Sequence, residues 1–367
     1  MKRVIVSVTN DLVTDNRVHK VCTSLSSFGY EILLVGRNLS NSEIVSRSYS
    51  TKRFRLIFNK GMFFYAEYNI RLFFFLLFAR VDIMLSNDLD SLPANYLASM
   101  FRNKKLVYDS HEYFTEVPEL IGRKRTQNIW LKIEKHILPK IKNAYTVCES
   151  LAKIYNEKYN VSFKVVRNAP LKTKENLTAI ELDFLKSKKV ILYQGALNVG
   201  RGIEKTISAM KYLENAVFLI IGKGDITEKL KQFAGKEGVT DKVKFLGRIP
   251  FEKLSAYTKL ADLGISLEEN MGLNYYYSLP NKIFDYIQAG VPILVSDFPE
   301  MKKIIDEYHV GICTLENDPE KLAGIIKKVL SDEFLQNEWK ANLLKAAEDL
   351  CWEKEEKILK GIFEEIS

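Results

Sequence analysis

The stretch that decides the fold is Leu279-Pro-Asn-Lys-Ile-Phe-Asp-Tyr-Ile-Gln-Ala-Gly290, followed at once by the apolar run Val291-Pro-Ile-Leu-Val295. Pro280 is expected where a helix opens, because the N–H that proline lacks is not needed in the first helical turn. Gly290 is expected to close that helix, and the apolar run is typical of a buried strand. The stretch therefore predicts a helix followed by a buried strand.

Two charged residues share one face of this predicted helix. Lys282 and Asp285 are three positions apart and lie near its N-terminus. That end carries free N–H groups and a partial positive charge, which favour an anion. A cation and a carboxylate placed there could hold a pyrophosphate and a ribose diol together. The alternative is an ordinary capped helix with an exposed lysine. Further motifs elsewhere in the chain are needed to choose between a nucleotide site and this alternative.

Length and composition predict two soluble globular domains. The chain has 367 residues, of which 47% are hydrophobic and 27% charged. Met1-Lys-Arg leads directly into the strand-like run Val4-Ile-Val-Ser-Val8, which is unlike a signal peptide. The four cysteines are scattered without a CxxC pair, so we expect reduced core thiols in a cytoplasmic protein.

Positive charge is concentrated in the first half of the chain. Residues 1–170 hold 26 Lys/Arg and 15 Asp/Glu, a net charge of +11, whereas the remainder carries −3. This asymmetry suggests that one domain faces an anionic partner. Nucleic acid is not expected, because aromatic residues are not interleaved with the basic ones as stacking platforms. An anionic membrane surface or a phosphorylated lipid fits, with Arg123-Lys-Arg125 adding to the basic face.

One segment, residues 63–79, is apolar enough to suggest a membrane span. Glu67 and Arg71 interrupt it and leave eight uncharged residues, 72–79. Crossing a bilayer needs roughly 20. We therefore expect a buried crossover helix, with a membrane-docking helix as the alternative.

Short apolar runs alternate with helical patterns along the whole chain, a rhythm that predicts βαβ units and parallel sheets. The polar stretch 170–178 is predicted to link two doubly wound domains, and two such domains imply a cleft between them. Residues 335–366 predict one or two further helices. The predicted strands are 4–8, 31–35, 54–58, 82–85, 105–108, 144–147, 164–166, 189–193, 217–221, 243–246, 262–266, 291–295 and 311–314.

A glycine-rich strand-to-helix turn, Gln194-Gly-Ala-Leu-Asn-Val-Gly-Arg-Gly202, precedes the predicted helix 203–212. Its glycines allow close approach of backbone to a ligand, and Arg201 supplies a guanidinium suited to a diphosphate. Two further turns, Ile221-Gly-Lys-Gly-Asp225 and Phe245-Leu-Gly-Arg-Ile-Pro250, follow at the carboxyl ends of later predicted strands. A single such turn is a weak signal, but three in one sheet favour a nucleotide site.

The chain resembles a glycosyltransferase of family 4 (the group 1 family) with the GT-B fold, and the resemblance extends over essentially the whole sequence. In the second half it rests on the three glycine-rich turns and the Lys282/Asp285 helix. The other motifs that carry it are Asp15-Asn-Arg-Val-His19, Phe28-Gly-Tyr-Glu-Ile32, Tyr108-Asp-Ser-His-Glu-Tyr-Phe114 and Cys351-Trp-Glu353.

For the fold, the resemblance implies two Rossmann-like doubly wound parallel-sheet domains that face each other across a cleft. Residues 1–169 would form the acceptor-side domain and residues 186–350 the nucleotide-sugar domain. A terminal helix, about 351–367, would cross back to the first domain.

For the site, the resemblance implies that Arg201 grips the donor diphosphate, that Asp285 binds the ribose, and that His111 contacts the donor sugar. Lys282 matches a variant of the family signature in which a lysine precedes the acid by three, and its charge would add to the stabilisation of the diphosphate. Arg201, Lys282 and His111 are the predicted catalytic residues. The predicted substrate-binding residues are Gly200, Gly202, Gly222, Arg248, Glu268, Glu269, Asp285, Asn16, His19 and Asp88.

The sequence departs from the family pattern at two positions. Tyr277 stands eight residues before Asp285, where the family signature has its first glutamate. Either Glu268 or Glu269 could substitute for it, because the following loop is longer than usual. Ala196 replaces an arginine that the family uses at the diphosphate.

No metal site is expected. Asp88-Leu-Asp90 resembles the metal-binding DxD motif of the other glycosyltransferase fold, but it directly follows a predicted strand of the first domain. We therefore assign it to the acceptor side or to helix capping. Protein cations and helix N-termini would stabilise the departing diphosphate instead, so no cofactor is expected beyond the donor.

The resulting hypothesis is transfer of a sugar from a UDP- or GDP-linked donor to a glycan or lipid-linked acceptor, with retention of configuration, in cell-surface polysaccharide or lipopolysaccharide-type biosynthesis. A cytoplasmic protein is expected, with peripheral attachment at the cytoplasmic face of the inner membrane. The alternatives are a GT-B epimerase or phosphorylase, and a non-catalytic nucleotide-sugar-binding protein.

Overall fold

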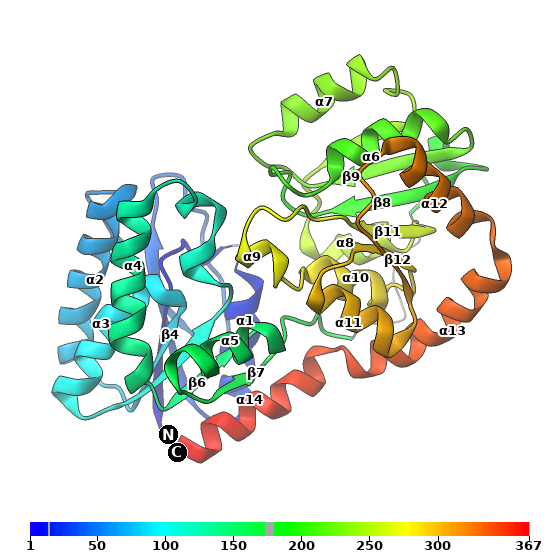
Figure 1. Cartoon of the computed structure of the whole chain (residues 1–367). Helices are drawn as coiled ribbons and strands as arrows, with labels where there is room; N and C mark the ends of the chain where they lie inside the picture. Colours follow the sequence, from blue (N-terminus) through cyan, green and yellow to red (C-terminus); the bar gives the residue numbers. More distant parts are fainter. Residues whose placement is uncertain (14, 173–179, 367) are drawn as a thin grey trace. The chain divides into compact units, whose positions relative to one another are not determined.

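The computed structural model describes residues 1–13, 15–172 and 180–366. The chain divides into two compact units (Figure 1). Unit 1 comprises Met1–Asn168 and Glu355–Ser367, and unit 2 comprises Ala169–Lys354. Of the predicted linker at 170–178, residues 173–179 lie outside the described part of the chain.

Unit 1 contains a seven-stranded, fully parallel sheet in the order β3-β2-β1-β4-β5-β6-β7. The order reverses between β1 and β4, which places a ligand crevice at their carboxyl ends in such folds. The strands are β1 (Arg3–Ser7), β2 (Glu31–Asn38), β3 (Ser50–Arg55), β4 (Ile83–Asn87), β5 (Lys105–Ser110), β6 (Asn143–Thr146) and β7 (Phe163–Val165).

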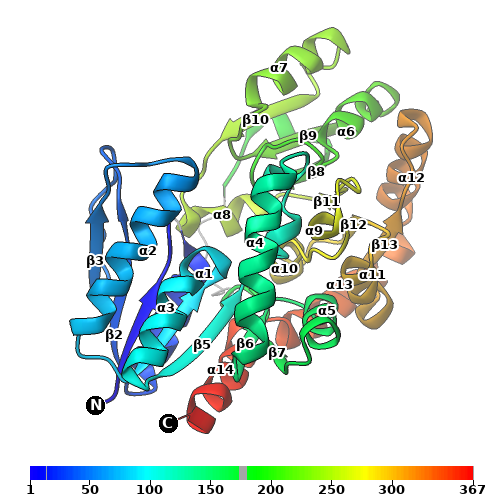
Figure 2. The same cartoon turned by 60° about the vertical axis from the view of Figure 1, so that its left-hand side comes forward.

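Among the described residues, six α-helices accompany this sheet, and α2, α3 and α4 lie side by side (Figures 1 and 2). The terminal helix α14 packs beside α1, where Ser24 Oγ donates to Glu356 Oε2 at 2.9 Å and Tyr30 Oη donates to the Phe363 carbonyl at 3.3 Å. The helices are α1 (Asn16–Ser27), α2 (Gly61–Phe78), α3 (Asp88–Arg102), α4 (Lys124–Ile137), α5 (Glu149–Tyr159) and α14 (Trp352–Ile366), with 3-10 turns η1 (Phe114–Glu116), η2 (Pro118–Leu120) and η3 (Leu138–Lys140).

Unit 2 contains a six-stranded parallel sheet in the order β10-β9-β8-β11-β12-β13, with its order reversing between β8 and β11. Its strands are β8 (Lys189–Gln194), β9 (Ala216–Ile221), β10 (Val243–Gly247), β11 (Leu263–Ser266), β12 (Ile293–Ser296) and β13 (Gly311–Thr314).

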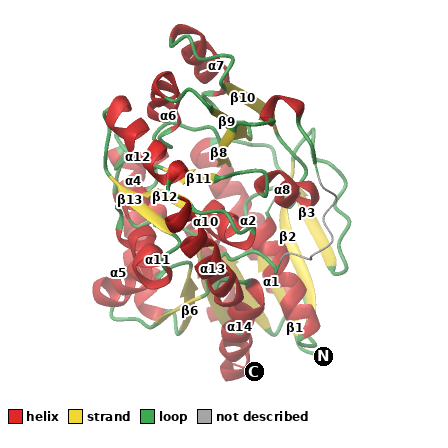
Figure 3. Cartoon of the chain, turned by 90° about the vertical axis from the view of Figure 1, so that its right-hand side faces the viewer, coloured by secondary structure: helices red, strands yellow, loops and turns green. Residues whose placement is uncertain are grey.

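Helices pack against the strands of each unit (Figure 3). In unit 2 they are α6 (Ile203–Ala209), α7 (Thr227–Lys236), α8 (Phe251–Thr258), α9 (Leu273–Tyr276), α10 (Asn281–Gln288), α11 (Pro299–Tyr308), α12 (Pro319–Ser331) and α13 (Glu333–Asp349), with 3-10 turns η4 (Asp183–Leu185) and η5 (Met210–Tyr212).

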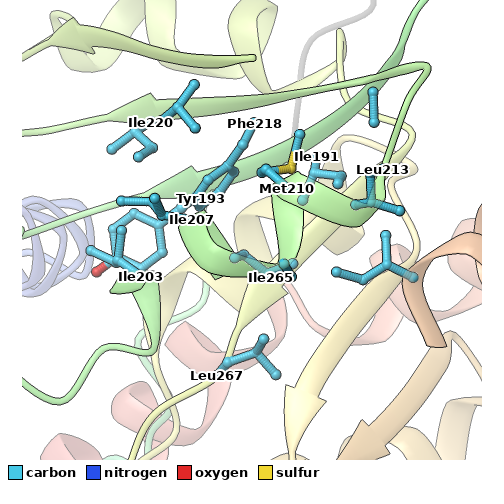
Figure 4. Packing of buried hydrophobic residues seen from close by; sticks show 14 of the residues in the cluster. Ile191, Tyr193, Ile203, Ile207, Met210, Leu213, Phe218, Ile220, Ile265 and Leu267 are labelled. Carbon is cyan, nitrogen blue, oxygen red and sulfur yellow. The ribbon is translucent and has the colours of Figure 1, made fainter. Parts of the chain in front are cut away.

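The core of unit 2 holds the glycine-rich turn in place. Ile203 and Ile207 of α6 are fully buried against Ile191 and Phe218 of the sheet (Figure 4). The same cluster includes Leu267, the residue before Glu268. Apolar packing therefore fixes the turn that carries Arg201 and the loop that carries Glu268.

Two local predictions in unit 1 are wrong. The third strand was expected at 54–58, but β3 is Ser50–Arg55, because the Glu67 carboxylate accepts the N–H groups of Ile57 and Phe58 that would otherwise pair in a sheet. Helix α2 does cross from β3 to β4, yet only 22% of it is buried. By length and composition it is the one helix among the described residues that could cross a membrane.

The four cysteines are not disulfide-bonded. Three are buried and Cys313 is half-buried. This agrees with their predicted role as core thiols.

Candidate functional site

A cavity of about 310 Å³ lies in unit 2 beside the end of β8 and the start of α10. This position is the carboxyl end of the sheet, next to the strand-order reversal between β8 and β11. Of the predicted site residues, Arg201, Lys282 and Asp285 line it together. Its complete lining is Tyr193, Gln194, Gly195, Ala196, Arg201, Leu254, Leu279, Pro280, Asn281, Lys282 and Asp285.

Helix α10 forms as the sequence predicts, with a one-residue shift at its start. Pro280 is the N-cap residue, and Gly290, with φ of +73°, follows the C-cap. Tyr286 anchors the helix to the sheet, because its hydroxyl lies 3.1 Å from the Leu192 carbonyl and 3.2 Å from the Ile265 carbonyl. A side chain at Gly264 would collide with the Tyr286 ring, so the close approach of helix and strand requires glycine there.

Lys282 lies in the first turn of α10 and is buried. Its Nζ donates to Glu268 Oε1 at 2.8 Å, while Glu268 Oε2 accepts from Ser266 Oγ at 2.7 Å. Burial alone would lower the pKa of Lys282, but the Glu268 carboxylate outweighs this and raises it. Burial likewise would raise the pKa of Glu268, and the Lys282 ammonium lowers it. Both groups are therefore charged at neutral pH.

Arg201 reaches the same carboxylate from the glycine-rich turn. Its Nη1 lies 3.7 Å from Glu268 Oε1, and its guanidinium carbon lies 4.5 Å from the centre of the Tyr275 ring. Two cations, one from the glycine-rich turn and one from helix α10, thus converge on one buried anion. Glu269, the other predicted substitute for the missing signature glutamate, is exposed.

The Asp285 carboxylate is oriented at the cavity wall by a short hydrogen-bond chain. Gln194 Nε2 donates to Asp285 Oδ2 at 2.9 Å, and Thr258 Oγ1 donates to Gln194 Oε1 at 2.8 Å. Gln194 ends β8 and Thr258 ends α8. The side chain is therefore held by two neighbouring elements as well as by its own helix.

Most glycines of the three turns have a packing role. Gly200, Gly202 and Gly222 all have positive φ, and a Cβ would collide with Met271, the Leu267 carbonyl and the Gly195 carbonyl, respectively. None of the three lines the cavity. Gly195 does line it and also has positive φ, and the nearest atom to a Cβ there is Lys282 Cε at 3.6 Å.

Arg248 is a predicted unit 2 residue that the structure does not place in this cavity. It is exposed in the loop after β10 and does not contribute to the cavity lining. The adjacent Gly247 has a φ of +70°, a backbone conformation that favours glycine, and this explains why the turn contains a glycine.

In unit 1, His111 lies at the carboxyl end of β5 among three polar residues. Its Nε2 is 3.1 Å from both Asp109 Oδ2 and Asn87 Oδ1, and its Nδ1 is 3.3 Å from Asp88 Oδ2. Burial alone would lower the pKa of His111, but the Asp88 and Asp109 carboxylates outweigh it and raise the pKa to about 9. His111 is therefore an imidazolium at neutral pH.

Two residues that the sequence analysis did not select hold this arrangement. Arg17 donates from Nη2 to Asp109 Oδ1 at 2.8 Å and from Nε to Asp109 Oδ2 at 3.2 Å, and both side chains are buried. Burial would raise the pKa of Asp109, yet Arg17 and His111 lower it to about 2. Arg17 follows Asn16 and Asp109 is two residues before His111, so both residues stand inside motifs quoted above. The sequence signal that could have identified them is their position in these two motifs.

Asp88 and Asp90 are both engaged with unit 1 residues. Asp88, which opens α3 with φ of +56°, accepts the backbone N–H of His111 at 2.8 Å. Asp90 accepts from Thr9 Oγ1 at 2.5 Å. Burial raises the pKa of each to about 7; the His111 charge opposes this shift at Asp88, whereas the Asp88 charge adds to it at Asp90. Asn87 is the N-cap residue of α3, so capping by the Asp88 side chain is not what the structure shows.

The two remaining unit 1 candidates lie on α1. Asn16 is exposed at its first position. His19 Nδ1 lies 2.9 Å from the Tyr49 hydroxyl, and burial followed by the Arg47 charge lowers the pKa of His19. His19 is thus neutral at pH 7, in contrast to His111.

These two parallel sheets, with the cation-lined cavity at the switch point of the second, define the class of protein: it has the GT-B fold of glycosyltransferases. Sucrose-phosphate synthase from Thermosynechococcus elongatus superposes with a TM-score of 0.81 at 16% identity, covering 100% of this chain and 99% of that chain. Anabaena HepE in complex with UDP-glucose superposes with a TM-score of 0.74 at 12% identity, covering 100% of both chains.

The sequence comparisons go one step further. Residues 177–346 match the family model of group 1 glycosyl transferases, in agreement with the predicted resemblance to the group 1 family. An uncharacterised glycosyltransferase of Methanocaldococcus jannaschii is 32% identical over 165 residues, which are 42% of this chain and 40% of that protein. The phosphatidyl-myo-inositol mannosyltransferase of Mycobacterium leprae is 24% identical over 169 residues, 45% of this chain and 43% of that protein. The chain thus matches less than half the length of these relatives.

Proposed function

We propose that the protein transfers a sugar from a UDP- or GDP-linked donor to a glycan or lipid-linked acceptor, in cell-surface polysaccharide or lipopolysaccharide-type biosynthesis. The observation that carries the proposal is the unit 2 cavity, where Arg201, Lys282 and Asp285 converge at the end of β8. One fold relative was solved with UDP-glucose, and one sequence relative is by name a mannosyltransferase with a phospholipid acceptor.

The proposed chemistry follows from the leaving group. The acceptor hydroxyl oxygen forms a new bond to the anomeric carbon and gives up its proton to the leaving diphosphate or to solvent. The C–O bond to the nucleoside diphosphate breaks, and the diphosphate takes the electron pair and gains negative charge. Arg201 and Lys282 would stabilise this charge, because they are held in place before the reaction by Glu268 and by ring contacts. The Asp285 carboxylate would accept hydrogen bonds from the ribose hydroxyl groups. We also propose that the anomeric configuration of the sugar is retained, because the family that the chain resembles implies retention.

The unit 1 cluster around His111 would face the donor sugar or the acceptor. An imidazolium fits a role in binding oxygen atoms or offsetting negative charge, because both of its nitrogens carry protons. A general base at His111 is not part of the proposal, since its pKa is raised to about 9.

No metal or cofactor is part of the proposal. Support comes from the two cations at the cavity and from Asp88 and Asp90, which are bound to His111 and Thr9 instead of standing open as a pair. The test is activity after EDTA treatment. Full turnover is expected, and loss that Mn²⁺ or Mg²⁺ restores would contradict this part.

The decisive experiment is a thermal-shift screen of UDP- and GDP-sugars, followed by product analysis with the donor that stabilises most. Specific binding raises the melting temperature by linkage. Arg201→Ala should abolish the shift, whereas the exposed Arg248→Ala should keep it. A sugar attached to an acceptor supports the transferase, and an altered or phosphorolysed donor sugar without an acceptor product supports the epimerase or phosphorylase alternative. Binding without turnover supports the non-catalytic one.

A cytoplasmic location with peripheral attachment to an anionic membrane completes the proposal. It is supported by the net charge of +11 on residues 1–170 and by the exposure of α2.

A further inference from the structure

The loop that leads from β11 to α10 packs directly on the glycine-rich turn that carries Arg201. The backbone N–H of Glu269 donates to the Gly200 carbonyl at 2.9 Å. A Cβ at Gly200 would lie 2.2 Å from Met271 Sδ and 3.1 Å from Tyr275 Cε2, so both side chains contact the backbone of the turn closely. The loop therefore forms one wall around the turn, and Tyr275 is part of that wall.

Tyr275 is itself held in place by its surroundings. It lies on α9, is 7% exposed, and its hydroxyl donates to the Val199 carbonyl at 3.4 Å. The ring of the next residue, Tyr276, lies 5.3 Å from the ring of Phe298, which is buried just after β12. These two contacts, one to the turn and one to the segment after β12, fix the position of the Tyr275 ring.

The guanidinium of Arg201 lies on this ring. Its carbon is 4.5 Å from the centre of the Tyr275 ring, which is within the range of a cation–π contact. The ion pair with Glu268 Oε1, at 3.7 Å, is too long for a hydrogen bond. Within residues 1–13, 15–172 and 180–366 the Arg201 guanidinium donates no hydrogen bond. The ring is therefore the contact that can orient the guanidinium plane.

Lys282, the other cation of the cavity, is held in a different way. Its Nζ donates to Glu268 at 2.8 Å, and its side chain is 8% exposed, compared with 24% for Arg201. One of the three ammonium donors is thus committed to a buried carboxylate. A guanidinium stacked on a ring keeps its N–H donors, because the ring contacts its face and the donors lie at its edge. Stacking therefore orients Arg201 without using the groups that would bind a diphosphate.

We propose that Tyr275 is a positioning residue for Arg201: its ring fixes the guanidinium plane at the cavity wall and leaves the N–H groups available to the donor diphosphate. Arg201 lines the cavity and Tyr275 does not, so Tyr275 acts through Arg201. The proposal rests on the proposed function for the diphosphate and adds the residue that orients its cation. Arginine is expected to be required at position 201, because an ammonium has no plane that a ring can orient.

The first test is the affinity of the full chain for inorganic pyrophosphate, measured by isothermal titration calorimetry. Tyr275→Leu should weaken binding about 2- to 30-fold, the range of one cation–π contact. Tyr275→Phe keeps the ring and should bind like the wild type. The matched control is Tyr308→Leu on α11, a half-buried tyrosine of the same unit outside the cavity lining, and it should also bind like the wild type. Equal losses in Tyr275→Leu and Tyr308→Leu would make Tyr275 a packing residue and overturn the proposal.

A double-mutant cycle separates positioning from packing. Arg201→Lys should lower the affinity for pyrophosphate in the wild type and have a smaller effect in Tyr275→Leu, because the ring favours a guanidinium over an ammonium only while it is present. The melting temperature of each variant is measured alongside, since a packing role would change stability without coupling the two positions. Strictly additive effects of the two substitutions on affinity would overturn the positioning role.

A measurement without ligand keeps the proposal falsifiable even if Tyr275→Leu folds poorly. In the wild type, the NMR signal of the Arg201 Nε–H group, assigned by its loss in Arg201→Lys, should carry a ring-current shift that Tyr275→Phe retains. A signal without this shift overturns the contact. Failure of the wild type to bind pyrophosphate would refute the proposed function at its diphosphate site, whereas binding that Tyr275→Leu leaves unchanged refutes only the positioning role.

Discussion

Glu268→Gln is the most informative single perturbation of unit 2. The substitution keeps the shape of the side chain but removes the charge that pairs with buried Lys282 and faces Arg201 at 3.7 Å. Lys282 would remain buried without its counter-ion, which costs about 3–5 kcal/mol in other proteins. For a unit the size of Ala169–Lys354, this corresponds to a fall in the melting temperature of roughly 6–20 °C.

The matched control is Glu269→Gln, one residue further on and exposed. It makes the same chemical change, and we expect it to alter stability by no more than about 0.5 kcal/mol. Differential scanning calorimetry of both variants provides the comparison. Equal melting temperatures for the two would refute the assignment of Glu268 as the buried partner of the cations.

The same pair predicts a pH dependence. Because the pKa of Glu268 is lowered in the folded state, its contribution to stability is fully present above its ordinary value of 4.5 and is lost as the pH falls through the lowered pKa. The difference in melting temperature between wild type and Glu268→Gln should therefore shrink in acid. A difference that stays constant from pH 7 to pH 3 would contradict the lowered pKa.

A double variant separates stability from ligand binding. Replacing a buried ion pair by apolar side chains is often neutral or stabilising. Glu268→Leu/Lys282→Met should therefore recover most of the stability that Glu268→Gln loses. Its thermal shift with a nucleoside diphosphate should stay reduced, because one cation of the cavity is gone.

Three further predictions concern other residues of the two sites. Arg201→Ala should slow sugar transfer by about 10²–10³-fold, the scale expected for one preorganised electrostatic group, and wild-type turnover would contradict its role. Asp285→Ala should raise the KM for the donor more than it lowers kcat, and Asp285→Glu should be tolerated; an unchanged donor affinity would remove the ribose assignment. Asp109→Asn should lower the pKa of His111 from about 9, measured by NMR titration, whereas Asp82→Asn, at a half-exposed acid paired with Lys104, should leave it unchanged.

The positions of strands and helices were largely accessible from the sequence, because apolar periodicity and Gly/Pro punctuation are local signals. Helix α10 begins within one residue of the expected place, and Asp285 and Lys282 share the cavity as their spacing predicts. The third strand was misplaced because its end depends on Glu67, a carboxylate several residues away on α2. Periodicity does not report such a side-chain-to-backbone contact.

The sequence by itself determined two doubly wound sheets, the switch-point helix with Lys282 and Asp285, and the basic character of the first half. Only the tertiary structure distinguished Glu268 from Glu269, since burial under Lys282 depends on how a loop packs against α10. Only it joined Arg17 to Asp109, 92 positions apart along the chain, and so explained why His111 is cationic. It also decided which face of α2 is exposed, because hydrophobic residues occupy both faces and the sheet covers just one.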